Sequence, residues 1–300
     1  MKDAKVFLSS VFRRALTRIS PTLNTKVCYY AKFHKRLDLK NPKTLNEKIS
    51  WLKLKNYSNN PLVKQCADKY KVREYLEDCG LSQLLNIVYG VYTNVDDIEW
   101  DKLPESFALK LNVGCDRNII VPDKSKLDIE KTKEIMRGWL KDNTYWVDYS
   151  ELQYKGVTPC ILIEKYLGDK ETGALPVDYK FYCFNASPEF VMFCVGRENE
   201  GHPKFYFFDK NWKLARINRD SKAAPEGFSL EKPKCFEQLL EAATILAKPF
   251  PFVRADFYIV DEKPIFGELT FTPTAGMDTN RLPETDVMMG NMLKLPKVNI

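Results

Sequence analysis

Two carboxylates near the C-terminal end of the chain are spaced so that they face each other across a predicted β-hairpin. The segment 252–271 alternates apolar and polar residues, as strands with one buried face do. If the polar triplet 261–263 forms the turn, the opposed pairs are Val260 with Pro264, Tyr258 with Phe266, Asp256 with Glu268, and Arg254 with Thr270. One face is then apolar (Val253, Ala255, Phe257, Ile259, Ile265, Leu269 and Phe271), and the other carries Arg254, Asp256, Glu268 and Thr270.

The facing pair Asp256 and Glu268 favours a bound cation. Residues opposite each other on paired strands lie about 5 Å apart, and like charges at that distance repel. Mg²⁺ prefers oxygen ligands and commonly binds one or two carboxylates together with substrate phosphates. The pattern therefore indicates a metal–nucleotide site. The alternative is a half-exposed hairpin whose charges face water.

Charged residues also interrupt other apolar strands of the sequence, at Lys110, Glu164, Lys165, Asp178 and Lys180. Lys and Glu are seldom buried without a partner, so each interruption alone favours a solvated strand face. Several cations that occur together with the carboxylate pair instead suit a polyphosphate and its metal ions.

The composition is that of a globular chain of one large or two modest domains. Its 300 residues are 44% hydrophobic and 13% aromatic, which is enough for a sizeable core and excludes disorder. The eight cysteines form no C-x-x-C pair and the only histidines are His34 and His202, which argues against a zinc site. Cysteines within apolar strands indicate buried free thiols and a reducing cytoplasm.

The positive charge is concentrated at the N-terminal end. The chain carries +6 in total, but residues 1–40 hold ten Lys/Arg against two Asp and contribute +8. This uneven distribution argues against a nucleic-acid partner. Residues 6–19 predict a short amphipathic helix with a stripe of Val6, Phe7, Val11, Ala15 and Ile19, and with Arg13, Arg14 and Arg18 toward its polar side. Such a helix either touches the anionic inner membrane surface or a membrane-bound partner, or packs on its own domain.

The remaining pattern predicts helices first and then an α+β body rich in antiparallel strands. Thr44 and Glu47 form a capping box that starts a helix within 41–56. A second helix is predicted over 61–79, closed by Gly80, and others over 128–141 and 235–248. Strands are predicted over 84–95, 107–112, 118–122, 160–167, 177–185, 189–196 and 204–208, before the hairpin.

The chain resembles the ATP-grasp superfamily, and within it the polysaccharide-biosynthesis branch similar to teichuronopeptide-synthesis (TupA-like) proteins. The resemblance covers about residues 41–280 and is carried by the strings at 41–53, 67–76, 178–185 and 254–273. It implies two α+β lobes with mainly antiparallel sheets that clasp a nucleotide. The expected organisation is a basic amphipathic segment (1–40), a helical region (41–100), a small lobe (101–167) and a C-terminal catalytic lobe (168–300).

The resemblance also implies a role for each charged residue. Lys69 and Lys110 would contact phosphates, beneath a loop at 113–118 that includes Gly114. The hinge Glu164, Lys165, Tyr166 and Leu167 would meet the adenine edge, and Asp178 would hold the ribose. The expected catalytic residues are Arg254, Lys180 and Arg197, and the expected metal ligands are Asp256, Glu268 and Thr270.

Two positions depart from the family pattern. Many members have a glycine-rich phosphate loop, whereas this one has only Gly114. The third metal ligand is usually Asn, two residues after the glutamate, and here it is Thr270. A hydroxyl is a weaker ligand than an amide oxygen, so a second metal ion would bind less tightly.

The resemblance implies an ATP-dependent carboxylate–amine ligase with Mg²⁺ (or Mn²⁺) as cofactor. Its acid would be a uronic acid or an amino acid, its amine a small amine, and its product an amide formed through an acyl phosphate in cell-surface polysaccharide synthesis. One alternative is a phosphotransferase that phosphorylates a glycan hydroxyl, and another is a binding module without catalysis. No general base for the amine is identifiable. His202 is a candidate, but its interpretation as a surface residue is favoured. The expected location is the cytoplasm, at the inner membrane face or beside polysaccharide-synthesis enzymes if residues 1–40 bind there.

Overall fold

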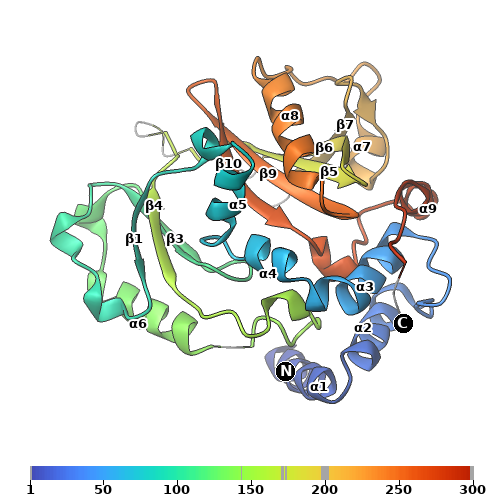
Figure 1. Ribbon diagram of the computed structural model, residues 1–300, viewed down its shortest axis with the longest axis horizontal. Coiled ribbons are helices and arrows are strands. Elements are labelled where there is room, and N and C mark those ends of the chain that lie inside the picture. The colour runs from blue at the N-terminus through green and yellow to red at the C-terminus, as the bar shows by residue number, and fades with distance from the viewer. Residues whose placement is uncertain (1, 143, 170–171, 173, 197–202, 298–300) are drawn as a thin grey trace.

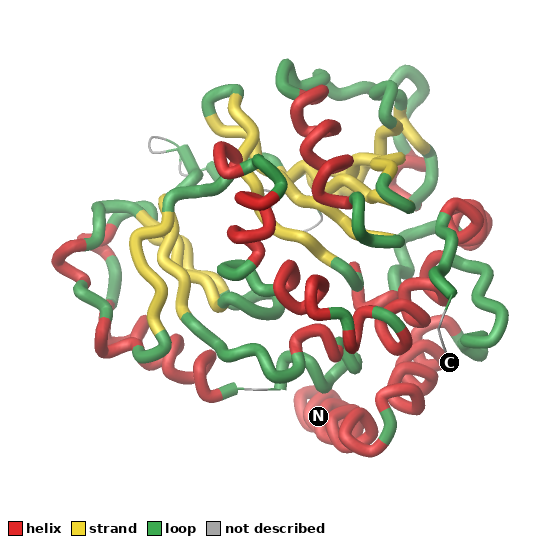
Figure 2. Tube along the Cα trace, viewed as in Figure 1, coloured by secondary structure: helices red, strands yellow, loops and turns green. Residues whose placement is uncertain are grey.

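Two antiparallel sheets organise the chain, as the computed structural model in Figures 1 and 2 shows. The structure describes residues 2–142, 144–169, 172, 174–196 and 203–297. The first sheet has the strand order β1-β4-β2-β3 and the second the order β10-β9-β5-β6-β7-β8. The strands are β1 Val88–Tyr92, β2 Phe107–Leu111, β3 Asn118–Val121, β4 Ile161–Lys165, β5 Asp178–Phe184, β6 Ser187–Val195, β7 Lys204–Asp209, β8 Leu214–Ala215, β9 Phe252–Val260 and β10 Lys263–Thr270.

Helices precede and cover these sheets, which confirms the predicted α+β class with a helical N-terminal region. They are α1 Lys2–Ile19, α2 Pro21–Phe33, α3 Leu45–Lys55, α4 Pro61–Ala67, α5 Val72–Asp78, α6 Ile129–Lys141, α7 Arg219–Ala223, α8 Phe236–Ala247 and α9 Pro283–Met292. The capping box of α3 is present, because Thr44 accepts from the Glu47 N–H and the Glu47 carboxylate accepts from the Thr44 N–H.

Each sheet has its own hydrophobic core. The core of the first sheet joins Phe107, Leu109 and Ile163 to Met136 of α6. The core of the second sheet includes residues of α3, α4, α5, α8 and α9, with Phe181 and Phe257 among its fully buried rings. Burial of one such side chain stabilises the fold by about 1.5–3 kcal/mol, so each sheet is a rigid support for the charged residues along its strands.

The single helix predicted over 61–79 is broken between α4 and α5. Asp68 leaves the helical conformation, with φ −87° and ψ 118°, and its carboxylate accepts from the backbone N–H groups of Tyr70 and Lys71. The other carboxylate oxygen accepts from Asn112, at the end of β2. This break directs Lys69 toward the loop that follows β2, where its backbone N–H donates to the Asn112 carbonyl at 2.8 Å.

The hairpin β9–β10 keeps the predicted carboxylate pair but not the predicted turn. Asp261 and Glu262 both have positive φ and form a two-residue turn, so Lys263 pairs with Val260 and Phe266 with Phe257. A bulge at Gly267 then shifts the register by one residue and restores the opposition of Asp256 to Glu268 and of Arg254 to Thr270. The predicted pairs of Val260 with Pro264 and Tyr258 with Phe266 are therefore wrong, and Phe266 takes the core position expected for Ile265.

The helix α1 forms as predicted, but Arg14 of its predicted polar side faces the protein, whereas Arg18 is exposed. Arg14 forms a two-bond ion pair with Asp148, and the Thr17 side chain is buried against residues 147–150. Val11, Ala15 and Ile19 of the expected apolar stripe are exposed instead. The side chains of Val6 and Phe7 lie outside the described part of the chain.

Candidate active site

The predicted charged residues of the second sheet form one cluster because their strands are in register. Strand β5 pairs with β9 so that Lys180 lies opposite Asp256, and β9 pairs with β10 so that Asp256 lies opposite Glu268. Lys180 Nζ lies 2.9 Å from Asp256 Oδ2 and 3.2 Å from Asp178 Oδ2. Lys180 is thus a neighbour of the carboxylate pair on the same sheet.

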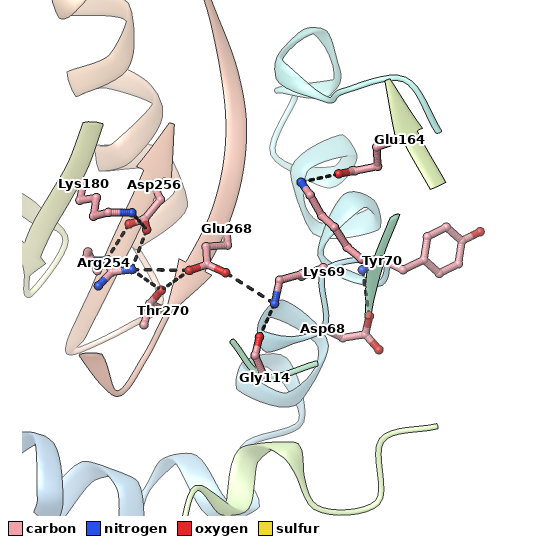
Figure 3. Close-up of polar contacts among 11 residues, drawn as sticks. Asp68, Lys69, Tyr70, Gly114, Glu164, Lys180, Arg254, Asp256, Glu268 and Thr270 are labelled. Atoms are coloured by element: carbon pink, nitrogen blue, oxygen red, sulfur yellow. Dashed lines mark hydrogen bonds and ion pairs between the residues drawn. The ribbon is translucent and has the colours of Figure 1, made fainter. Parts of the chain in front are cut away.

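Arg254 occupies the space between the two facing carboxylates (Figure 3). Its guanidinium donates to both oxygens of Asp256, at 2.7 and 2.6 Å, and its Nη2 lies 3.5 Å from Glu268 Oε1. Thr270 completes the bridge, because its hydroxyl accepts from Arg254 at 3.0 Å and donates to Glu268 at 3.1 Å. The departure at Thr270 therefore has a structural role: its hydroxyl links the arginine to the outer carboxylate.

The neighbouring cations favour the ionised form of the Glu268 carboxyl. Burial alone would raise the pKa of Glu268, but the charges of Lys69, Arg254 and Lys180 outweigh burial and lower this pKa to about 2. Burial would likewise lower the pKa of Lys180, but the facing Asp256 carboxylate outweighs it and raises that pKa. These two pKa shifts favour the charged forms of Glu268 and Lys180.

Lys69 connects the cluster to the first sheet. Its Nζ donates to the Gly114 carbonyl at 2.5 Å and lies 3.6 Å from Glu268 Oε2. Gly114 has a φ of 76°, a conformation that favours glycine, at the start of the loop between β2 and β3. Lys69 thus links Gly114, in the loop expected to cover the phosphates, to Glu268, an expected metal ligand (Figure 3).

Lys110 and Glu164 pair with each other on the first sheet. They lie on the neighbouring strands β2 and β4, and Lys110 Nζ donates to Glu164 Oε2 at 2.7 Å. Tyr166 is buried and Leu167 is half-buried. The Lys165 side chain is exposed, and its backbone N–H and carbonyl bond to residues 86 and 87. Arg197, the third expected catalytic residue, lies outside the described part of the chain.

The donor set at the hairpin suits a hard divalent cation that also binds phosphate. Asp256, Glu268 and Thr270 offer two carboxylates and a hydroxyl on one sheet face. Within the described residues, no group of three or more His, Cys, Asp or Glu side chains is placed to hold a metal. Phosphate oxygens and water would have to complete the coordination sphere of Mg²⁺, and Arg254 would have to move aside.

A cavity of about 680 Å³ opens beside the cluster. Arg254, Glu268 and Thr270 line one end of it, and residues of α1 and α2 line another part. Its volume lies in the range of small-molecule sites. No pattern within residues 1–40 predicted their part in this wall.

Two further cavity residues were missed by the sequence analysis. The Arg117 side chain pairs with Asp142 through Nη2, while its buried Nη1 has no hydrogen-bond partner among the described residues. The Glu151 carboxylate accepts from the Thr272 hydroxyl at 2.6 Å, and burial raises its pKa against the opposing effects of Thr272 and Lys53. Arg117 lies in the loop 113–118 that was expected over the phosphates, but its own role was not predicted. Glu151 lies in no periodic strand or family string, so no local signal marked it.

Lys69 links the charged cluster of the second sheet to the loop between the antiparallel strands β2 and β3 of the first sheet. The chain belongs to the TupA-like ATP-grasp family, whose model matches residues 47–294. This match confirms the family that the sequence strings indicated. No curated protein matches the chain.

Several solved structures with similar folds are named as ligases, among them the following three. The D-alanine–D-alanine ligase from Bacillus anthracis complexed with ATP is 14% identical, with a TM-score of 0.46 over 76% of this chain and 62% of that one. An L-amino acid ligase from Bacillus licheniformis is 13% identical, with a TM-score of 0.44 over 90% and 61%. The phosphoribosylamine–glycine ligase from Thermotoga maritima is also 13% identical, with a TM-score of 0.44 over 86% and 59%. The chain thus spans less than two thirds of each of these proteins.

Proposed function

We propose that the chain is an ATP-dependent carboxylate–amine ligase that acts in the synthesis of a capsular or other cell-surface polysaccharide. The observation that carries this proposal is a connected series of charges: Asp178, Lys180, Asp256, Arg254, Glu268 and Lys69. Two of them, Arg254 and Glu268, line the cavity. Catalysis of phosphoryl transfer depends mainly on positioning the reactants and neutralising the phosphate charge. A series of fixed charges can do both. The cavity beside it has room for a second substrate.

ATP would lie between the two sheets. In this arrangement Lys69 and Lys110 contact its phosphates, the loop 113–118 covers them, Asp178 holds the ribose and the segment 164–167 meets the adenine. Mg²⁺, or Mn²⁺ in its place, would be held by Asp256, Glu268 and Thr270. The bound ion would neutralise charge on the β- and γ-phosphate oxygens.

The proposed reaction has two steps. A carboxylate oxygen of the acid attacks the γ-phosphorus, the bond to the bridging oxygen breaks and ADP leaves. The amine nitrogen then attacks the carbonyl carbon of the acyl phosphate, inorganic phosphate leaves and the nitrogen loses a proton. Arg254 and Lys180 stabilise the charge that develops in the first step, with Arg197 at the γ-phosphate or the second substrate.

The acid in this proposal is a uronic acid of the glycan or its precursor, or an amino acid, and the amine is a small amine or an amino sugar. The eight cysteines are free thiols, which suits a reducing cytoplasm where ATP is available. Enzymes of polysaccharide synthesis are the expected protein partners.

We assign Glu151 as the general base that accepts the proton of the amine. It lines the cavity with Arg254 and Glu268, and its burial keeps its pKa above the ordinary 4.5 of a glutamate. The titratable groups around it are Lys53, Tyr154 and Cys115, each of which interacts with its charge. A carboxylate with a raised pKa is a stronger base than an exposed one, as proton abstraction from an amine requires.

Glu151→Gln is expected to slow amide formation by roughly 10²–10⁴-fold, because the amide side chain cannot accept the proton. Only the ionised Glu151 carboxylate can accept a proton, and this form is lost as the pH falls toward and below the raised pKa of Glu151. The wild-type rate should therefore decline on the acidic side, and the variant should lack this decline. Assays of the rate of amide formation at a series of pH values measure both the slowing and the pH profile. An unchanged rate and pH profile in the variant would contradict the assignment of Glu151.

The reaction type is tested by the products. A ligase releases ADP and inorganic phosphate only when acid and amine are both present, and mass spectrometry then detects the amide. A glycan phosphotransferase, the alternative, releases ADP without an amine and leaves phosphate on the glycan. If no acid–amine pair stimulates ADP release while a glycan alone becomes phosphorylated, the ligase proposal fails.

A further inference from the structure

The helix α1 is attached to the protein through its polar side. Arg14 binds Asp148 through two bonds, at 2.9 and 3.0 Å. The buried hydroxyl of Thr17 donates to the Val147 carbonyl at 2.5 Å and lies 2.8 Å from the Ser150 hydroxyl. These contacts reach across 130 residues of sequence or more, so the orientation of α1 is set by the tertiary structure.

The helix α2 is fixed by the same segment. Its buried Asn24 donates to Thr17, to the Asp148 carbonyl and to Ser150, at 2.8, 3.2 and 3.1 Å. Cys28 and Tyr29 pack with Ala275 and Met277 in a small core of their own. A buried polar network of this kind is costly to break, so the two helices present a fixed face to their surroundings.

The opposite side of the two helices is apolar and exposed. Six large apolar residues define this outer helical face: Val11 (48% exposed), Phe12 (57%), Ile19 (78%), Leu23 (46%), Val27 (37%) and Tyr30 (56%). In Figure 1 both helices lie at the lower edge of the molecule. Scattered exposed apolar residues are normal, but a gathering of this size marks an interaction site.

Exposed cations lie on the same two helices and in the segment that follows α2. They are Arg18, Lys26, Lys32, Lys35 and Arg36, and Asp38 is the only acid in residues 10–40. Apolar side chains flanked by Lys and Arg are the combination that binds at the headgroup level of an anionic bilayer. Among the described residues no helix is long and apolar enough to cross a membrane, so contact at the surface is what this part of the chain offers.

We propose that the outer helical face docks on the surface of an anionic lipid bilayer. The apolar side chains would enter the headgroup region and the cations would contact lipid phosphates. Phe12 and Val27 also line the cavity, so docking places an edge of the cavity beside the bilayer. The docking does not depend on the proposed ligase function, because it is measured without ATP or acceptor.

Flotation of the full chain with phosphatidylglycerol–phosphatidylcholine vesicles tests the proposal. Binding to vesicles with about 30% phosphatidylglycerol is expected to exceed binding to pure phosphatidylcholine by at least about tenfold, because each cation near an anionic surface adds attraction. Raising the NaCl concentration from about 0.05 to about 0.5 M should remove most of this difference, because salt screens the charges.

The double variant Ile19→Ser, Leu23→Ser separates apolar insertion from charge. Vesicle binding should weaken by about tenfold or more, because both side chains lose their apolar burial. Ile87→Ser is the matched control: Ile87 is 54% exposed but lies outside the outer helical face, so binding should not change. Both substitutions replace exposed residues, and thermal unfolding checks that the fold is kept.

Two results would overturn the proposal. One is equal binding to anionic and neutral vesicles at low salt. The other is reversible self-association in sedimentation that the double variant abolishes, because a second copy of the chain would then cover the outer helical face. Either result leaves the proposed ligase function intact, and the product assay tests that function separately.

Discussion

Glu268→Gln is expected to lower ATP-dependent turnover on the order of a thousandfold while the protein stays folded. The variant keeps the shape of the side chain but removes the charge that faces Lys69 and Arg254. It also removes one of the two carboxylates of the proposed metal site. ADP release in the presence of Mg²⁺ measures the loss, and circular dichroism with thermal unfolding checks the fold.

Glu268 is a better position for this test than Asp256. The Glu268 side chain is 38% exposed, whereas that of Asp256 is 4% exposed and bonds both Lys180 and Arg254. Asp256→Asn would leave two buried cations without their shared counter-ion, so lost activity and lost stability would be mixed. The replacement at Glu268 leaves that buried pairing in place.

Glu262→Gln is the control for Glu268→Gln. Glu262 lies in the turn of the same hairpin, and its ion pair with Lys234 is exposed on both sides, so the change should leave turnover unaffected. Turnover retained in Glu268→Gln would remove this carboxylate from the proposed site. Wild-type protein that binds ATP without any turnover would instead support the binding-module hypothesis.

Gly290→Ala is expected to destabilise the protein by about 3 kcal/mol, through overpacking between α9 and the start of α3. A Cβ at this position would lie 2.0 Å from the Lys43 carbonyl oxygen, 2.8 Å from the Thr44 carbonyl carbon and 2.9 Å from the Leu45 nitrogen. All three are backbone atoms, which cannot turn away as a side chain can. Denaturant unfolding of the variant measures the change.

Gly138→Ala makes the same substitution in another helix, α6, and should have the opposite effect. No atom lies within 4 Å of a Cβ built there. Alanine has the higher helix propensity, so the variant should be stabilised by about 0.5–1 kcal/mol. Equal effects at both positions would show that the contact of α9 with α3 is looser than the structure indicates.

The sequence by itself determined the elements whose signals are local. The Thr44–Glu47 capping box, the apolar alternation of the strands and the opposition of Asp256 to Glu268 each depend on residues close in the chain. The strings at 41–53 and 254–273 identified the family in the same way. The predicted turn was wrong by one residue, and the bulge at Gly267 restored the pairing only where the carboxylates lie.

The tertiary structure decided what lies beside those residues. Arg254 fills the gap between the carboxylates, Thr270 links it to Glu268, and Glu151 joins the cavity through Thr272, 121 residues away. The sequence also left open which side of α1 packs against the protein, because an amphipathic pattern defines two sides of a helix but not which of them is buried. Contacts with residues 147–150 turned its polar side inward. The physical reason is the same in each case: these arrangements depend on groups far apart in sequence, and folding alone brings them together.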